Sequence, residues 1–188
     1  MAKAIVGLGN PGPEYERTRH NAGYLLADHL VARWRLGPFR RADVAVAASG
    51  TLGSVPVRVL KPTTFMNASG DALRALRSPV FNAADDLLVL VDDVAFDPGV
   101  FRLKGAGSAG GHNGLKSVES ALRRQDYPRL RIGIGAKPPE YDDLADWVLG
   151  KMRADERAAF DASLDAMAEA VECWVVDGIE RAMNRFNR

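Results

Sequence analysis

Cysteine and histidine are scarce in this sequence of 188 residues, which contains one cysteine, Cys173, and three histidines. A single cysteine cannot form a disulfide within the chain, and this suits a reducing compartment. The histidines and the cysteine lie far apart in the sequence, without the spacing of a metal site such as H-E-x-x-H or C-x-x-C. The sequence therefore predicts neither a disulfide framework nor a bound metal.

Long apolar runs are also missing. No stretch of about 18 apolar residues is present, so we expect no membrane-spanning helix. The first residues, Met1–Val6, lack the long apolar stretch and cleavage site of a signal peptide, so we expect a cytoplasmic protein. No repeats, low-complexity tracts or long linkers occur. A hydrophobic content of 47% suffices for one core, and we predict a single domain over residues 1–188.

The formal net charge of +1 conceals a segregation of charge along the chain. Residues 101–137 carry eight Lys or Arg against two acidic residues, a local charge of +6. Residues 138–180 carry twelve acidic residues against three basic ones, a local charge of −9. The acidic stretch is typical of a solvated helical face. The basic stretch has the same simple interpretation, or it is a footprint for the phosphate backbone of a nucleic acid.

Hydrophobic periodicity predicts strands that alternate with helices. The predicted strands are Lys3–Leu8, 43–49, 55–60, Leu87–Val91, Val100–Lys104 and Leu130–Ile134. The predicted helices are Asn21–Trp34, 69–77, 113–123 and a long C-terminal helix over 154–186. This alternation is typical of an α/β fold with a mixed, largely parallel central sheet flanked by helices.

The loop after the first predicted strand reads Gly7-Leu8-Gly9-Asn10-Pro11-Gly12, which formally satisfies G-x-G-x-x-G. A dinucleotide-binding oxidoreductase is therefore one interpretation. Its context argues against it, because Pro11 and Pro13 crowd the position where the phosphate-binding helix should begin. The next predicted helix starts only near Asn21, and no acidic residue ends a second strand about 20 residues further on.

His20 and Asp92 are candidates for acid–base chemistry. His20 lies where a loop enters a helix, and a single histidine at such a place is most often a surface or capping residue. With a pKa near neutrality, however, it can take a proton from water. Asp92 follows five apolar residues at the end of the strand Leu87–Val91 and could orient the imidazole through its second nitrogen. The simple alternative for Asp92 is a turn or helix cap.

Three asparagines, Asn10, Asn67 and Asn113, lie in three separate polar loops. Asparagine both donates and accepts hydrogen bonds, which suits an amide or carbonyl substrate, although asparagine also simply favours turns. The segment Gly105–Asn113 is rich in glycine, which indicates close approach to a ligand or a mobile lid. Its Ser108 is a near match to the G-x-S-x-G nucleophile elbow of serine hydrolases. Several glycines separate Ser108 from strand and helix, which disfavours that class.

Taken together, these stretches resemble the bacterial peptidyl-tRNA hydrolase family. The matching pieces are Ile5–Gly12 with Tyr15, Thr18–Gly23, Lys61–Asn67 with Ser69-Gly70, Asp92-Asp93, Pro98-Gly99, Gly110–Ser117 and Arg129–Gly135. The resemblance runs from the first predicted strand to the last helix, and all pieces in this order form a very specific pattern. One departure is Asp93-Val94-Ala95, where many members have an acid-leucine-acid run, so a role for a third carboxylate is in doubt.

The resemblance implies hydrolysis of the ester between a peptide and the 3′ ribose of tRNA, so that the tRNA is recycled. It implies that His20 activates the attacking water and that Asp92 orients His20. Asn10, Asn67 and Asn113 would hold the peptide and the ester, with Tyr15 near the ester. Lys104, Lys116 and Arg131 match basic positions that approach tRNA phosphates.

The resemblance further implies a monomer that works without metal or cofactor. We predict direct hydrolysis with no covalent intermediate. The alternative from another class is a non-catalytic tRNA-binding or ribosome-associated module that keeps the fold. The joint presence of His20, Asp92 and the three asparagines argues against that alternative.

Overall fold

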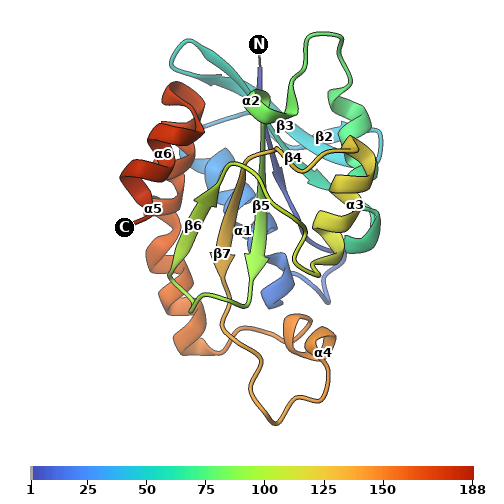
Figure 1. The fold of residues 1–188 in the computed structure, drawn as a ribbon, viewed down its shortest axis with the longest axis vertical. Helices are drawn as coiled ribbons and strands as arrows, with labels where there is room; N and C mark the ends of the chain where they lie inside the picture. Colours follow the sequence, from blue (N-terminus) through green and yellow to red (C-terminus); the bar gives the residue numbers. More distant parts are fainter. Residues whose placement is uncertain (1) are drawn as a thin grey trace.

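A computed structural model describes residues 2–188 and contains one seven-stranded sheet with helices on both faces (Figure 1). The strands are β1 (Lys3–Gly7), β2 (Arg40–Ala42), β3 (Ala45–Leu52), β4 (Val55–Pro62), β5 (Leu87–Asp93), β6 (Phe101–Lys104) and β7 (Arg129–Gly133). The α-helices are α1 (Ala22–Arg33), α2 (Ala83–Asp86), α3 (Asn113–Leu122), α4 (Leu144–Val148), α5 (Ala154–Asp177) and α6 (Ile179–Phe186). Two 3₁₀ helices, η1 (Arg19–Asn21) and η2 (Met66–Leu76), complete the set.

The sheet order is β2-β3-β4-β1-β5-β7-β6. The central strands β4, β1, β5 and β7 run parallel, whereas β2, β3 and β6 pair antiparallel at the two edges. The predicted α/β fold with a mixed, largely parallel sheet is confirmed. β2, α2 and α4 were not predicted, since each has only three to five residues and too little periodicity to detect.

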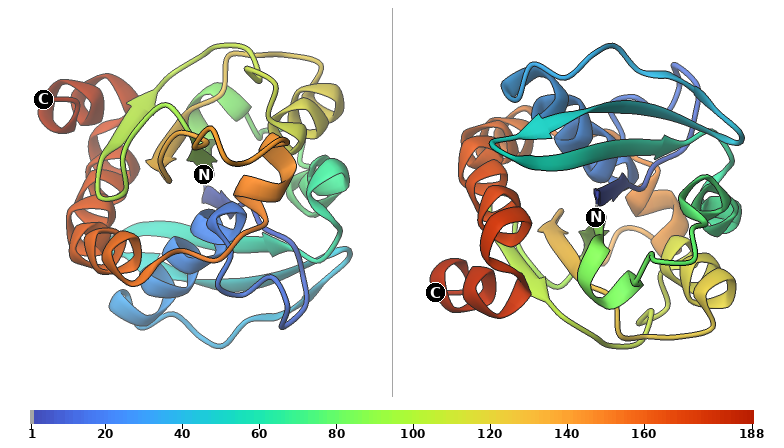
Figure 2. Two further views of the ribbon diagram at one scale, coloured as in Figure 1. Left: turned by 90° about the horizontal axis from the view of Figure 1, so that it is seen from below. Right: turned by 90° about the horizontal axis from the view of Figure 1, so that it is seen from above.

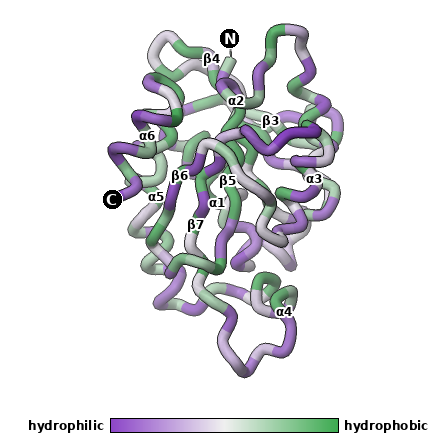
Figure 3. The backbone as a smooth tube through the Cα atoms, in the orientation of Figure 1, coloured by the Kyte–Doolittle hydropathy of each residue, from purple (hydrophilic) through white to green (hydrophobic). Residues whose placement is uncertain are grey.

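Both faces of the sheet are covered, because successive side chains of a strand point to opposite sides. In β5, Leu88 and Leu90 belong to the core shared with α1, α5 and α6. Leu87, Val89 and Val91 belong to the core on the side of η2 and α3. Figure 2 shows the C-terminal helices and α3 on opposite sides of the sheet, and Figure 3 shows the hydrophobic character of the central strands. The apolar run of β5 thus reflects burial from both sides.

Two predictions about helices were wrong in detail. The predicted helix over 69–77 is the 3₁₀ helix η2, which begins earlier and is kinked at Ala68. The predicted single helix over 154–186 is broken into α5 and α6 at Gly178, whose backbone has φ 86° and ψ 174°. The break turns α6 back against the edge strand β6, where Asn187 donates to and accepts from the backbone of Leu103.

Among residues 2–188, no helix is both long enough and apolar enough to cross a membrane. A pocket lies at the carboxyl ends of the parallel strands, where ligand sites are expected in α/β folds. The loop after β1, the end of β5 and the segment before α3 all meet at this edge, and α4 lies beside them (Figure 1).

Candidate active site

A pocket with a volume of about 770 Å³ lies at this carboxyl edge. This falls within the range of about 300–1,000 Å³ that is usual for ligand sites. Its lining comes from segments far apart in the sequence, namely Asn10, His20, the start of η2, the end of β5, the segment 108–113 and the helix α4. Of the nine residues predicted for the site, seven line this pocket: Asn10, His20, Asn67, Asp92, Lys104, Asn113 and Arg131.

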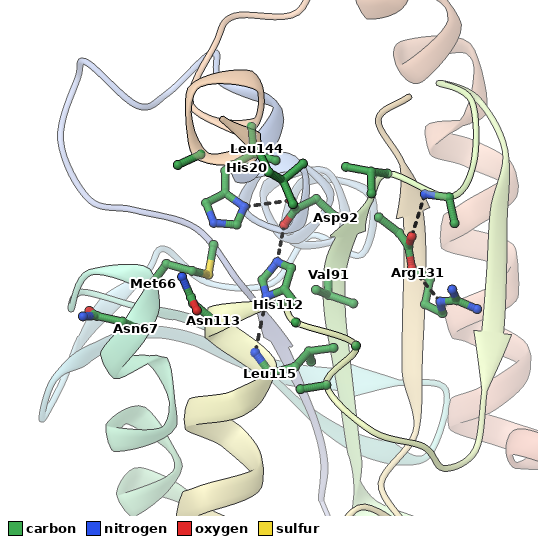
Figure 4. A pocket seen from close by; sticks show the side chains of 18 of the residues that line it. His20, Met66, Asn67, Val91, Asp92, His112, Asn113, Leu115, Arg131 and Leu144 are labelled. Carbon is green, nitrogen blue, oxygen red and sulfur yellow. Dashed lines mark hydrogen bonds and ion pairs between the residues drawn. The ribbon is translucent and has the colours of Figure 1, made fainter. Parts of the chain in front are cut away.

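Asp92 lies at the centre of a chain of hydrogen bonds between two histidines (Figure 4). Its Oδ2 is 2.7 Å from Nδ1 of His20, and its Oδ1 is 2.8 Å from Nε2 of His112. The Asp92 side chain is 2% exposed, and the two imidazoles are 12% and 14% exposed. The sequence predicted the pairing of His20 with Asp92, and the two side chains are in contact. It assigned no role to His112.

The contacts of His112 define which of its nitrogens carries the proton. His112 precedes α3 and caps it, because Nδ1 accepts from the backbone N–H groups of Gly114 and Leu115 at 3.1 and 3.3 Å. A nitrogen that accepts carries no hydrogen, so Nε2 of neutral His112 must be protonated and donates to Asp92. Asp92 is thereby left to accept from both histidines. His20 donates through Nδ1, and its Nε2 keeps a free lone pair toward the pocket.

Electrostatics follow from this arrangement. Burial alone would raise the pKa of Asp92, but His112 and His20 hold that pKa well below its usual range, so the carboxylate stays ionised. Burial lowers the pKa of His20, whereas the charge of Asp92 and the hydrogen bond to it raise it, and the net pKa lies above the usual value. His20 is therefore a stronger base than a free imidazole.

His20, Asp92 and His112 are also the one group within residues 2–188 whose potential ligand atoms fit a metal ion, lying within 4.8 Å of one another. The hydrogen bonds do not suit that use. Two backbone N–H groups occupy Nδ1 of His112, so its Nε2 is protonated and cannot ligate unless the α3 cap is broken. The geometry fits proton transfer better than cation binding. The absence of a metal stays a prediction.

Asn10 is held in place by a second asparagine, Asn21, which the sequence analysis did not single out. The side chain of Asn21 accepts from the backbone N–H of Asn10 at 2.8 Å and donates to its carbonyl at 3.0 Å. Oδ1 of Asn10 in turn accepts from the backbone N–H of Met66 at 2.7 Å. These bonds fix Asn10 against η2 and leave its amide nitrogen as the group available to a substrate.

Asn67 and Asn113 are exposed and line the pocket beside Met66 (Figure 4). Tyr15 does not line the pocket. It packs edge-on against Phe65, with ring centroids 6.2 Å apart, and Phe65 lines the pocket with 60% of its surface exposed. Tyr15 therefore supports the pocket lining through its contact with Phe65.

The predicted basic residues divide into two groups. Lys104 is exposed at the pocket, and Arg131 also lines it, although Arg131 is paired with Asp93 at 2.7 Å and lies 4.8 Å from the ring centre of Phe96. Lys116 is exposed on α3 and does not line the pocket. Strand alternation explains why Lys104 and Arg131 lie at the pocket. Leu130 and Ile132 of β7 point into the core, so Arg131 points the other way. Leu103 of β6 also points into the core, so its neighbour Lys104 points the other way.

Comparison with known proteins adds to the geometry. The sequence model of the family described as "Peptidyl-tRNA hydrolase" matches residues 4–188. The chain is 49% identical to the peptidyl-tRNA hydrolase of Gemmatimonas aurantiaca, covering 99% of this chain and 100% of that protein. It is 45% identical to the one from Symbiobacterium thermophilum, and both chains are covered completely. A crystal structure of peptidyl-tRNA hydrolase from Acinetobacter baumannii superposes with a TM-score of 0.90 at 34% identity, covering 99% of this chain and 94% of that one.

The α/β fold, the pocket at the carboxyl edge of its sheet and these full-length matches define an enzyme of the hydrolase class. The chain belongs to the peptidyl-tRNA hydrolase family. The resemblance inferred from the sequence is confirmed.

Proposed function

We propose that this protein hydrolyses the ester between a peptide and the 3′ ribose of tRNA with a water molecule that His20 activates. The free Nε2 of His20 accepts a proton from the water, and the resulting hydroxide attacks the ester carbonyl. Asp92 accepts a hydrogen bond from Nδ1 of His20. This bond holds the imidazole of His20 in the reactive tautomer and stabilises the imidazolium that forms. His20 then returns the proton to the leaving 3′-oxygen, and no covalent intermediate forms.

The single observation that carries this proposal is the His20–Asp92–His112 chain at the base of the pocket. His112 donates to Asp92 and cannot take a proton from it at Nε2, so Asp92 remains a charged partner for His20. Ser108, the candidate nucleophile of the rival mechanism, is exposed and only its carbonyl is engaged, by Arg129. No histidine is hydrogen-bonded to it among residues 2–188, so it lacks the base that a serine nucleophile needs.

We assign Asn10, Asn67 and Asn113 to the peptide and the ester, with Tyr15 supporting them through Phe65. The amide nitrogen of Asn10 is the best placed of these donors, because all its other polar groups are already bonded. An amide donor directed at the oxyanion lowers the barrier of ester cleavage. Lys104, Lys116 and Arg131 are assigned to tRNA phosphates. We further propose a cytoplasmic monomer without cofactor or metal, over one domain of residues 1–188.

The test is release of N-acetylated amino acid from acylated tRNA by the wild type and by His20→Ala. General base catalysis is worth about 10²–10⁴-fold, so we expect the variant to lose at least about tenfold in kcat with an unchanged melting temperature. An unchanged rate in the folded variant would remove His20 from the mechanism. tRNA binding without turnover in either protein would instead favour the binding-module alternative.

A further inference from the structure

Residues 17–19, directly before His20, are paired with residues 150–152, which follow the C-cap of α4. The backbone N–H of Arg19 donates to the carbonyl of Gly150 at 3.0 Å, and the N–H of Met152 donates to the carbonyl of Arg17 at 3.2 Å. Thr18 and Lys151 form an isolated antiparallel bridge between these bonds. The segment that carries His20 is thus joined to the end of α4, although about 130 residues separate them in the chain.

The side chain of Arg19 strengthens this junction and is only 2% exposed. Its guanidinium lies 3.4 Å from the ring centre of Trp147 in α4. Nη1 donates to the carbonyl of Trp147 at 3.1 Å, and Nη2 donates to Oε2 of Glu156 at 2.8 Å. Gly150 provides the space for this packing, because a Cβ there would lie 2.7 Å from Nη1. One arginine therefore contacts α4 by stacking and hydrogen bonding and the first turn of α5 by an ion pair.

The opposite side of α4 forms part of the pocket wall. Leu144, Val148 and Leu149 all line the pocket, and Leu144 and Leu149 are 47% and 42% exposed there. A helix of five residues has no stability of its own, so tertiary contacts must hold it. Trp147 provides several such contacts, since besides its contacts with Arg19 its Nε1 donates to the carbonyl of Gly135 at 3.0 Å.

We propose that Arg19 is a positioning residue for substrate binding, which holds the apolar wall of α4 at a set distance from His20. An apolar part of the substrate lies against Leu144 and Leu149 while its ester faces His20. This inference rests on the proposed placement of the ester in this pocket. A buried ion pair is by itself weak evidence for stability. Arg19 has a further effect, because it contacts α4, which lines the pocket, and directly precedes His20 in the chain.

Arg19→Lys tests the proposal, because lysine keeps the charge beside Glu156 but loses the planar stack on Trp147. We expect KM for N-acetylaminoacyl-tRNA to rise about fivefold to tenfold, with kcat within about twofold, as for a loss of uniform binding. The pH at which the rate falls on the acid side should not move. Arg33→Lys is the matched control, since Arg33 also pairs with carboxylates but lies on the outer contact of α1 with α5.

A coupling experiment separates this role from general stabilisation. If Arg19 acts through α4, then Leu149→Ala, which shortens the wall itself, should raise KM, and adding Arg19→Lys should raise it little further. Hydrogen exchange should become faster in Arg19→Lys over residues 144–152 and stay unchanged in β5.

Three results would overturn the proposal. They are an unchanged KM in folded Arg19→Lys, fully multiplicative effects in the double variant, and a displaced acid limb, which would place the effect of Arg19 on His20. The proposed mechanism fails separately, through a fully active His20→Ala.

Discussion

At position 112 a histidine caps α3, where Ser, Thr, Asp or Asn is usual. The choice has a consequence for the site, because the nitrogen used for the cap decides which nitrogen donates to Asp92. A serine at this position would cap the helix equally well but would leave one oxygen of a buried carboxylate without a partner. An unpaired buried oxygen of this kind is costly. Residue 112 therefore links the start of a helix to the charge state of Asp92.

At the residue scale, the proposed mechanism predicts that Asp92 sets the pH dependence of the rate. In the proposed mechanism His20 must be neutral to accept a proton, so kcat/KM should fall as the pH drops through the pKa of His20. Because Asp92 holds the pKa of His20 above its usual value of about 6.5, the acid limb of the wild type should lie above that pH. In Asp92→Asn only burial remains, so we expect the limb to move below pH 6.5, with a smaller loss of rate than in His20→Ala.

The measurement is kcat/KM between about pH 5 and 8, which reports the pKa of the free enzyme. His112→Asn is the control, since asparagine can still cap α3 and the contact of His20 with Asp92 remains. The acid limb of His112→Asn should lie at a higher pH than the acid limb of Asp92→Asn. If the limbs of wild type and Asp92→Asn coincide, Asp92 does not set the basicity of His20.

At the scale of elements, the C-terminal helices show how one residue redirects the chain. The helical pattern of residues 154–186 continues through Gly178, yet α5 ends at Asp177 and α6 begins at Ile179. The backbone of Gly178, with φ 86° and ψ 174°, is in a region that residues with a Cβ avoid. α6 can therefore pack on β6, and Asn187 satisfies the backbone of Leu103 at this sheet edge.

We expect Gly178→Ala to destabilise the protein by about 1–3 kcal/mol, the usual cost of forcing a residue into this region. A Cβ at this position would meet no atom within 4 Å, so the cost is conformational rather than steric. Chemical denaturation provides the measurement, and kcat should stay unchanged because α6 does not line the pocket. Gly37→Ala is the control, since a Cβ there also meets nothing and its φ is not positive. Equal stability of the two variants would contradict this account.

At the scale of the whole molecule, the basic stretch of the sequence contributes cations to the pocket. Lys104 and Arg131 come from the antiparallel pair β6 and β7 and line the pocket, and the acidic residues Asp93 and Asp143 line it as well. Within residues 2–188 no carboxylate lies within ion-pair distance of Lys104, while Arg131 is already paired with Asp93. Lys104 is therefore the freer of the two cations, and we expect it to contribute more than Arg131 to the proposed binding of a tRNA phosphate.

We expect Lys104→Gln to raise KM and to reduce the slope of log KM against log salt by about 1, with kcat almost unchanged. The effect of Arg131→Gln should be smaller, because its charge is partly compensated. The measurement is turnover of N-acetylaminoacyl-tRNA across a series of salt concentrations. Arg181→Gln, on exposed α6, should leave the slope unchanged. If Lys104→Gln leaves KM and slope unaltered, the RNA lies on another face.

The local pattern of the sequence was sufficient for much of this fold. The central strands, α1, α3 and the alternation that makes the fold α/β were predicted because burial on one or both faces imposes a period on apolar residues. Family membership followed from motifs in order along the chain. His20 and Asp92 stood out because His20 directly precedes the predicted helix Asn21–Trp34 and Asp92 directly follows the predicted strand Leu87–Val91.

Contacts between distant segments were beyond such reasoning. Trp147 of α4 contacts Arg19, far away in the chain, and nothing in the acidic stretch around 140–150 indicates that this stretch lines the pocket. Asn21 and His112 were visible as residues, but their roles depend on which atoms they meet. The sequence by itself determined the central strands, α1, α3, the family and the candidate chemistry, because these depend on neighbours in the chain. Only the tertiary structure decided the tautomer of His112, the direction in which the pKa values of His20 and Asp92 shift, and the fact that α4 lines the pocket. These features depend on distances of a few ångströms between residues that lie far apart in the chain.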